Sequence, residues 1–419
     1  MKDSLKSYIP VVYICSLILI CLWSSIAIFY LVTPIFCIIL LNDLFKHKTK
    51  PQSFKINSID IAVLIILASE LIGYFFSIYK PNSFPYLFKF SLLTLFYFFY
   101  RYIIKFTWQQ NLITTFVAFY CLVLSLLTVF YFFLFYFNIT TEGFANITEF
   151  RNFYAPMGIH SNEWVTVLLA LLPFQIITLN NYYQNKLLKI VFGISVPITV
   201  FCILISFSRG AYIAFAAFVI ISVIWLIKSK IFTLKTMIIG YSFFIIISTI
   251  CIAPFYKYVL STISMFNTTS QQRSFEGRTN ILKNTFTMFK EYPITGIGSN
   301  NFPLRYGSQI NNVVENTFAS RIANTMLQII IEKGILGILS YGILLFIFIK
   351  MSLKRLKKKL NPFNIFSTIF FLCTILAICL RELSFSTLFE TNSLLFLVFI
   401  IFLLNTHESM QGDQPIVYE

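Results

Sequence analysis

A series of long apolar runs, separated by short segments that hold most of the charge, constrains this chain more than any other feature. Of its 419 residues, 58% are hydrophobic and only 11% are charged, whereas soluble domains are roughly 25% charged. About 20 apolar residues in a helix cross the core of a bilayer. The sequence therefore predicts an all-α integral membrane protein that forms one polytopic domain over residues 1–419.

Twelve runs are long enough to be membrane spans. They cover residues 8–24, 25–45, 59–79, 85–105, 109–137, 161–180, 186–206, 209–227, 234–254, 325–350, 362–380 and 385–405. The first run is too long for the apolar part of a signal peptide, and no small-residue cleavage site follows it, so we interpret it as an uncleaved span. Two connecting segments, 138–160 and 255–324, are much longer than the others.

The distribution of basic residues predicts the orientation. Cytoplasmic loops of membrane proteins are enriched in Lys and Arg, and most of the 32 basic residues fall on one side if both termini are cytoplasmic, including the run "KMSLKRLKKK". The two long segments then lie on the outer face. The net charge of +16 sits in short loops, which leaves no basic domain for a nucleic acid. All eight cysteines lie in apolar runs without metal-type spacing, so we predict neither a disulfide nor a zinc site.

One arginine interrupts the apolar pattern at the outer end of a span. In "CILISFSRGAYIAFAAFVI", Arg209 has no carboxylate nearby in the sequence. Its guanidinium group matches phosphate oxygens bidentately, Ser206 and Ser208 add hydroxyl donors, and Gly210 allows close approach to the backbone. The N-terminus of the following helix adds partial positive charge. We predict an anion site here, against the alternative of an arginine that only snorkels at a helix end.

A second arginine opens a helical pattern in the long outer segment "SFEGRTNILKNTFTMFKEYPITGIGSNNFPLRYG". Arg278 precedes a short amphipathic helix expected at the membrane interface. Pro293 ends this helix, and Gly296 and Gly298 form a tight turn ahead of Asn300. A cation at a helix N-terminus opposes the helix dipole, so we expect a bound anion beside Arg278. The apolar residues of this helix are Ile281, Leu282, Phe286 and Phe289.

The stretch "VENTFASRIANTMLQIIIEKGILGILSYG" leads into the next span. Glu315 and Arg321 precede the span, and Asn324 and Gln328 lie one turn apart at its outer mouth. Charged residues inside spans usually face a cavity or a partner. Here we expect Glu332 and Lys333 to pair with each other or with an arginine, or to line a site. Two further charged positions are Glu70, within the third span, and the pair Arg381–Glu382 at an outer turn.

These residues together predict an outer-facing cavity lined by arginines, suited to an anionic headgroup whose tail stays in the lipid. A lipid-linked diphosphate has this chemistry. Carboxylate and imidazole groups near the cavity supply candidates for a general base, namely Glu315, Glu332 and His160. The outer segments contain no Asp and no D-x-D motif, and a metal–diphosphate clamp needs carboxylate ligands. We therefore expect a metal-independent reaction without a cofactor.

Three of these stretches resemble the signatures of the O-antigen ligase and O-antigen polymerase superfamily. They are "SFSRGAYIAF", "GRTNILKNTFTMFKEYPITGIGSNNF" and "ANTMLQIIIEKGILGIL", in the family's order, and the strong resemblance covers about residues 155–345. The resemblance implies a C-type glycosyltransferase of the bacterial inner membrane. It would transfer a glycan from undecaprenyl diphosphate to an acceptor hydroxyl. Arg209 and Arg278, with Ser208 and Arg321, would hold the diphosphate, and Asn324, Gln328 and Asn300 would contact acceptor or sugar.

One departure from the family pattern separates two activities. Ligases that attach O-antigen to lipid A–core carry a histidine before the asparagine of the third signature, whereas this chain has Ala323 before Asn324. Alanine cannot accept a proton, so the sequence favours a polymerase, with Glu315 or His160 as the base and a chain-length regulator as a further partner. A ligase is the alternative within the enzyme class. A flippase or transporter for the same lipid-linked sugar is the alternative outside it, disfavoured because the inner halves of the spans hold few charges apart from Glu70.

Overall fold

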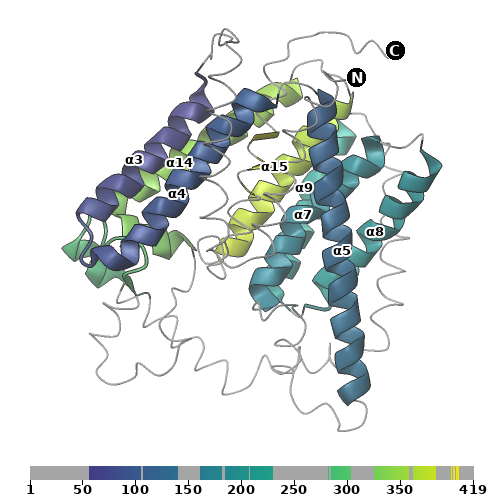
Figure 1. The fold of residues 1–419 in the computed structure, drawn as a ribbon, viewed down its shortest axis with the longest axis horizontal. Coiled ribbons are helices and arrows are strands. Elements are labelled where there is room, and N and C mark those ends of the chain that lie inside the picture. The colour runs from purple at the N-terminus through teal and green to yellow at the C-terminus, as the bar shows by residue number, and fades with distance from the viewer. Residues whose placement is uncertain are drawn as a thin grey trace, which may run out of the picture. The chain divides into compact units, whose positions relative to one another are not determined.

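The structure is a computed structural model of the chain. It describes residues 56–104, 107–139, 161–181, 185–206, 208–229, 282, 285–302, 325–357 and 362–383, with positions 398, 400, 401, 403 and 404. These residues form helices and connecting turns, with no strand among them. The long helices are α3 (Ser58–Phe75), α4 (Lys80–Ile103), α5 (Thr107–Ile139), α7 (Ser161–Asn181), α8 (Lys186–Leu204), α9 (Arg209–Lys228), α14 (Thr325–Lys357) and α15 (Pro362–Glu382) (Figure 1).

Seven of these helices are long and apolar enough to cross a membrane, namely α3, α5, α7, α8, α9, α14 and α15. The prediction of an all-α chain with many membrane spans is confirmed to that extent. The eighth, α4, corresponds to the predicted span 85–105 but is not among the seven. The predicted spans 8–24, 25–45, 234–254 and 385–405 lie wholly or largely outside the described residues, so the count of twelve stays a prediction.

Local capping explains where several helices begin. Asn57 and Asp60 form a capping box at the start of α3, in which each side chain accepts a hydrogen bond from the other's backbone N–H at 2.9 and 2.7 Å. The Asn185 side chain accepts from the Leu188 N–H at the start of α8. Such caps satisfy backbone donors that have no partner within the helix, and they fix the first turn of each span.

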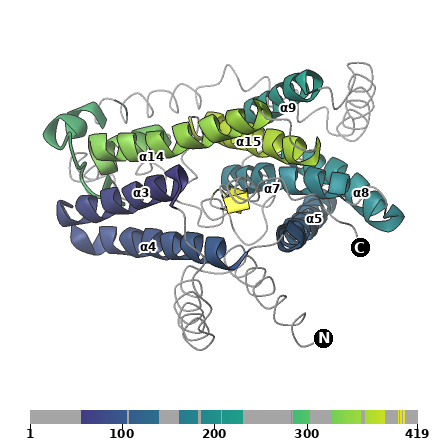
Figure 2. The ribbon, with the colours of Figure 1, turned by 90° about the horizontal axis from the view of Figure 1, so that it is seen from above.

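The chain divides into two compact units. Unit 1 contains α3, α4, residues 285–302 and α14 up to residue 354. Helices α3 and α4 pack side by side (Figure 2). Residues 285–291 form a short helix whose Met288 packs on Ile297, Phe302 and Ile331 of α14. The outer segment therefore has its own apolar contact with the first turns of α14.

This short helix confirms part of the sequence prediction. It ends just before Tyr292 and Pro293, as expected for a helix stopped by proline. The predicted apolar stripe does not face the protein, however, because Leu282 and Phe286 are exposed while Met288 is buried. The exposed stripe is compatible with the interfacial position predicted from the sequence, which stays a prediction.

Unit 2 contains α5 from residue 110, α7, α8, α9 and α15. Helix α7 packs on α8 and α15, and α15 packs on α9. The apolar part of α7 is 78% buried, whereas that of α9 is only 28% buried. Helix α7 therefore lies at the centre of the unit, and α9 turns large apolar side chains such as Ile213 and Ile220 outward. An outward apolar face is what lipid contact requires.

Two charged residues, one at the start of α3 and one at the end of α4, are buried and paired with each other. The Asp60 carboxylate forms an ion pair with Arg101 of α4 and accepts a hydrogen bond from the Tyr97 hydroxyl at 2.8 Å. Both ionic side chains are almost completely buried. The capping box places Asp60 inside the first turn of α3, where it faces the packed neighbour helix instead of water.

Candidate functional site

In unit 2, polar side chains gather where the first turns of α7 and α9 meet the last turn of α15. The Ser208 hydroxyl donates to the Asn162 side-chain oxygen at 2.8 Å. The Arg381 guanidinium donates to the Asn162 backbone carbonyl at 3.3 Å. Asn162 thus links the residue before α9 to the last turn of α15. The predicted alternation of spans puts these three helix ends on one face of the membrane, and the contacts agree with that arrangement.

Arg209 is the first residue of α9, and its side chain is exposed. Ser208 before it is the N-cap residue and is buried, with its hydroxyl used by Asn162. Ser206 is also buried; it accepts from the Ser208 N–H at 3.3 Å and donates to the Ile203 carbonyl at 2.6 Å. The two serines therefore shape the turn that presents Arg209. Direct contact of Ser208 with a phosphate stays a prediction.

This arrangement can bind an anion. The first N–H groups of a helix have no intrahelical partner, and the helix dipole adds partial positive charge at the same end. At the start of α9, an exposed guanidinium group coincides with that charge, and the buried Arg381 lies across Asn162 from it. A phosphate or diphosphate group is the ligand chemistry that such a site favours.

Unit 1 contains a second polar site, built on a break in α14. Gly334 has φ 59° and ψ −153°, which is not helical. The inserted turn, residues 293–300, enters this break. Its Ile297 and Gly298 N–H groups donate to the Ile331 and Glu332 carbonyls, both at 2.9 Å, and α14 then donates back. The returning bonds are Ile335 N–H to the Pro293 carbonyl at 2.9 Å and Leu336 N–H to the Ile294 carbonyl at 3.1 Å.

The predicted tight turn at Gly296 and Gly298 is confirmed, since both have positive φ, 68° and 91°. A Cβ at Gly296 would lie 2.4 Å from the Glu332 carbonyl carbon, and a Cβ at Gly298 would lie 2.3 Å from the Ser77 hydroxyl oxygen. Only glycine lets this turn enter the helix break. The Asn301 amide nitrogen then anchors the turn by donating to the Ser77 and Ser83 hydroxyls and to the Ile297 carbonyl.

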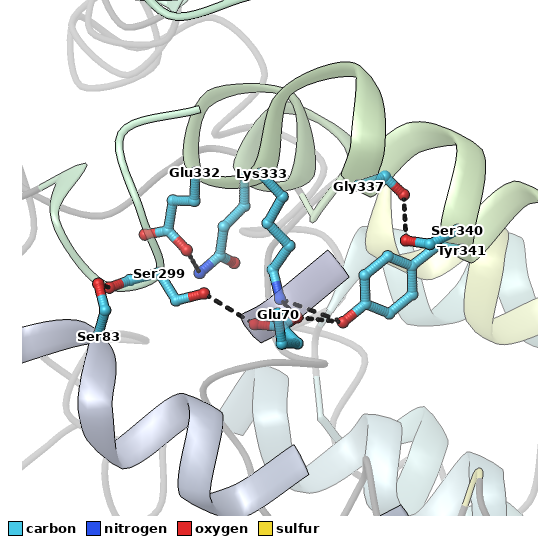
Figure 3. Close-up of polar contacts among 9 residues, drawn as sticks. Glu70, Ser83, Ser299, Glu332, Lys333, Gly337, Ser340 and Tyr341 are labelled. Atoms are coloured by element: carbon cyan, nitrogen blue, oxygen red, sulfur yellow. Dashed lines mark hydrogen bonds and ion pairs between the residues drawn. The ribbon is translucent and has the colours of Figure 1, made fainter. Parts of the chain in front are cut away.

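A buried ionic cluster lies beside this turn (Figure 3). Lys333 of α14 forms an ion pair with Glu70 of α3, and both side chains are almost completely buried. Glu70 also accepts from the Tyr341 hydroxyl at 2.9 Å and from the Ser299 hydroxyl at 3.1 Å. The Lys333 ammonium lies 4.7 Å from the centre of the Phe90 ring. Three polar groups, from α14 and from the inserted turn, therefore converge on the Glu70 carboxylate.

The cluster corrects two expectations. Lys333 pairs with Glu70 and not with its neighbour Glu332, because consecutive residues of a helix point in different directions. Glu332 instead accepts from the Gln328 amide at 3.3 Å, one turn earlier on α14. The second expectation placed Glu70 in the inner half of its span. It lies near the C-terminal end of α3, beside Ser299 of a predicted outer segment.

Two predicted acceptor-side residues belong to this second site. Gln328 is buried and contacts Glu332, as described above. Asn300 has φ 62°, and its carbonyl accepts from the Asn82 amide at 3.4 Å. The structure thus places both residues near the helix break, on α14 and on the inserted turn. The remaining predicted site residues lie outside the described residues: His160, Arg278, Glu315, Arg321 and Asn324.

The sequence did not predict the roles of several residues of these sites. Asn162 stands in "MGIHSNEWVTVLLALLP", where a polar residue directly before an apolar run signals a helix start and nothing more. Gly334 stands in the quoted third signature, but a glycine within an apolar run does not reveal a break. Glu70 and Lys333 were noticed singly, and no local pattern could pair residues 263 positions apart.

Comparison with known protein families finds a match in this region of the chain. Residues 194–342 match the O-antigen ligase family. The matched range contains Ser208 and Arg209, the start of α9, the inserted turn and the break in α14. The resemblance to the O-antigen ligase and polymerase superfamily is confirmed. A search of curated proteins finds no match.

Proposed function

We propose that this protein, which carries an O-antigen ligase domain, is a polymerase that joins lipid-linked glycan units at the outer face of the bacterial inner membrane. The domain indicates a membrane glycosyltransferase of the ligase and polymerase type. The donor in the proposal is an undecaprenyl diphosphate-linked oligosaccharide, and the acceptor is a hydroxyl on a second glycan. Both termini are cytoplasmic in this proposal, so that the site faces the periplasm.

The observation that carries the proposal is the geometry at the start of α9. An exposed guanidinium, Arg209, stands on a helix N-terminus inside the matched domain. When the bond between the sugar C1 and the diphosphate oxygen breaks, negative charge grows on the leaving diphosphate. Fixed donors aimed at that charge stabilise the transition state more than the ground state. Removing one such donor typically costs about 3–4 kcal/mol, or about 10²–10³-fold in rate.

Proton removal from the acceptor hydroxyl completes the reaction. The proton goes to a general base as the hydroxyl oxygen attacks C1, and undecaprenyl diphosphate leaves. We assign this role to Glu315 or His160, which stays a prediction from the sequence. A polymerase is preferred over a ligase because Ala323 stands where ligases of the family carry a histidine. A chain-length regulator would then be a natural partner.

The test is transfer by the purified full-length protein in detergent. The substrate is the lipid-linked repeat unit extracted from a strain that lacks this protein. We expect longer lipid-linked oligomers and released undecaprenyl diphosphate. We expect Arg209→Ala to reduce the rate at least 100-fold, and Arg209→Lys to recover little of it because lysine lacks the planar fork.

The matched control is Lys228→Ala, since Lys228 is the last residue of the same helix. It should transfer at the wild-type rate. A wild-type rate for Arg209→Ala would refute the role of the guanidinium group. Glycan added to lipid A–core, without longer oligomers, would identify a ligase. No transfer by correctly folded wild-type protein would favour a flippase, because detergent removes the compartments that a flippase acts between.

A further inference from the structure

The Glu70 side chain links α3 to the inserted turn and to both parts of the broken α14. Its carboxylate contacts Lys333 directly before Gly334 and Tyr341 two turns after it. It also accepts from Ser299 on the turn. The single carboxylate therefore fixes the two halves of the helix relative to each other and to the turn that separates them (Figure 3).

The ion pair between Glu70 and Lys333 determines orientation more than stability. A buried ion pair is seldom more stabilising than a well-packed apolar pair of the same size, because both charges lose their hydration. What it adds is orientation: the ammonium of Lys333 must stay between the carboxylate and the Phe90 and Tyr341 rings. A charge pair at this position fixes one register of the turn against α14, which apolar side chains would not do.

The inserted turn and the first turns of α14 carry the residues expected to contact the acceptor. Asn300 follows Ser299 on the turn, and Gln328 lies just over one turn of helix before Lys333 on α14. Ser299 is held from two sides, since its hydroxyl donates to Glu70 and its carbonyl accepts from the Ser83 hydroxyl at 2.8 Å. Movement of Ser299 or Lys333 would therefore displace the groups that contact the acceptor.

We propose that Glu70, paired with Lys333, is a positioning residue that keeps the outer turn docked in the α14 break, and so sets the place of the acceptor. The role in acceptor placement depends on the proposed function, whereas the docking itself does not. Loss of the carboxylate leaves the Lys333 charge buried without its ion-pair partner. Separation of the turn from α14, which lets water reach that ammonium, relieves the cost.

The chain offers a matched control on the same helix. Asp60, like Glu70, is a buried carboxylate of α3 that pairs with a basic residue and a tyrosine. Its ionic and tyrosine partners, Arg101 and Tyr97, both belong to α4, so these two contacts join α3 to α4. Asp60→Asn reports the general cost of breaking a buried ion pair in this unit.

The experiment compares Glu70→Gln, Asp60→Asn and the exchanged pair Glu70→Lys with Lys333→Glu, all as full-length protein in detergent. Docking is measured as the rate of trypsin cleavage after Lys290, which is exposed at the end of the short helix. Transfer is measured with the lipid-linked repeat unit, at a temperature where each variant remains folded. We expect Glu70→Gln to increase cleavage and to decrease transfer, each at least tenfold, and the exchanged pair to recover part of both.

Asp60→Asn should keep both rates within about twofold of wild type while lowering the melting temperature. Equal behaviour of Glu70→Gln and Asp60→Asn would overturn the proposal, because Glu70 would then only stabilise the fold. Faster cleavage with normal transfer would overturn the acceptor role. If wild-type protein shows no transfer, the proposed function fails, while the cleavage rates still decide whether Glu70 docks the turn.

Discussion

The break in α14 makes a quantitative prediction for Gly334→Ala. In a continuous helix, the Ile335 and Leu336 N–H groups would donate to the Ile331 and Glu332 carbonyls. In the structure these four groups bind the inserted turn instead. Two helical hydrogen bonds are thus exchanged for four. At about 1 kcal/mol net for each bond, the exchange favours the docked state by about 2 kcal/mol, or roughly 30-fold.

Alanine at this position opposes docking in three ways. A side chain at φ 59° and ψ −153° costs about 1–3 kcal/mol. Its Cβ would lie 2.5 Å from the Ile294 carbonyl oxygen, so the turn must move. In the closed helix, alanine is favoured over glycine by about 1 kcal/mol. The first and third effects together amount to about 2–4 kcal/mol, enough to cancel or reverse the preference before the overlap with Ile294 is included.

The assay is hydrogen–deuterium exchange of full-length protein in detergent, followed at the Ile297 and Gly298 amides. We expect exchange at least tenfold faster in Gly334→Ala than in wild type. The control is Gly342→Ala in the same helix, where a Cβ meets nothing within 4 Å, and exchange should be unchanged. Unchanged protection in Gly334→Ala would refute the competition between turn and helix. Equal loss of protection in both variants would refute its location at the break.

Two further predictions concern the α9 site and the need for a metal. Asn162→Ala removes the side-chain oxygen that accepts from the Ser208 hydroxyl and orients the loop ahead of Arg209. The transfer rate should fall about tenfold, as expected for the loss of one hydrogen bond of about 1–1.5 kcal/mol. A wild-type rate would contradict this coupling. Because the outer segments contain no Asp and no D-x-D motif, incubation with EDTA should leave the transfer rate unchanged. Loss of transfer that Mg²⁺ restores would show that the reaction needs a metal.

Hydropathy predicted the helical spans, and proline and glycine predicted where the short helix ends and the chain turns. The seven helices able to cross a membrane match predicted runs, because a helix in lipid must satisfy its backbone internally and needs an apolar surface of sufficient length. Pro293 ends the short helix and Gly296 and Gly298 make the turn, since their backbone preferences act within a few residues. The position of Arg209 at the start of α9 was likewise predicted, because this arginine interrupts the apolar pattern between two runs.

The start of α4 differs from the sequence prediction. The run 85–105 was expected to begin at residue 85, but α4 begins at Lys80 and contains Pro85. Lys89 lies buried in the same helix, where its ammonium is 5.7 Å from the centre of the Tyr86 ring. Hydropathy counts such a lysine against a span, whereas packing within unit 1 removes it from the surface.

By itself, the sequence determined which segments are apolar enough to be helices in a membrane and where backbone chemistry starts, stops or turns them. Only the tertiary structure decided that Lys333 pairs with Glu70 and not with Glu332, and that the inserted turn takes the place of two helical hydrogen bonds at Gly334. The physical reason is the distance along the chain over which each effect acts. Propensity and hydropathy act between neighbours in the chain, but a buried charge or a broken helix is satisfied by whichever group the fold brings within about 3 Å.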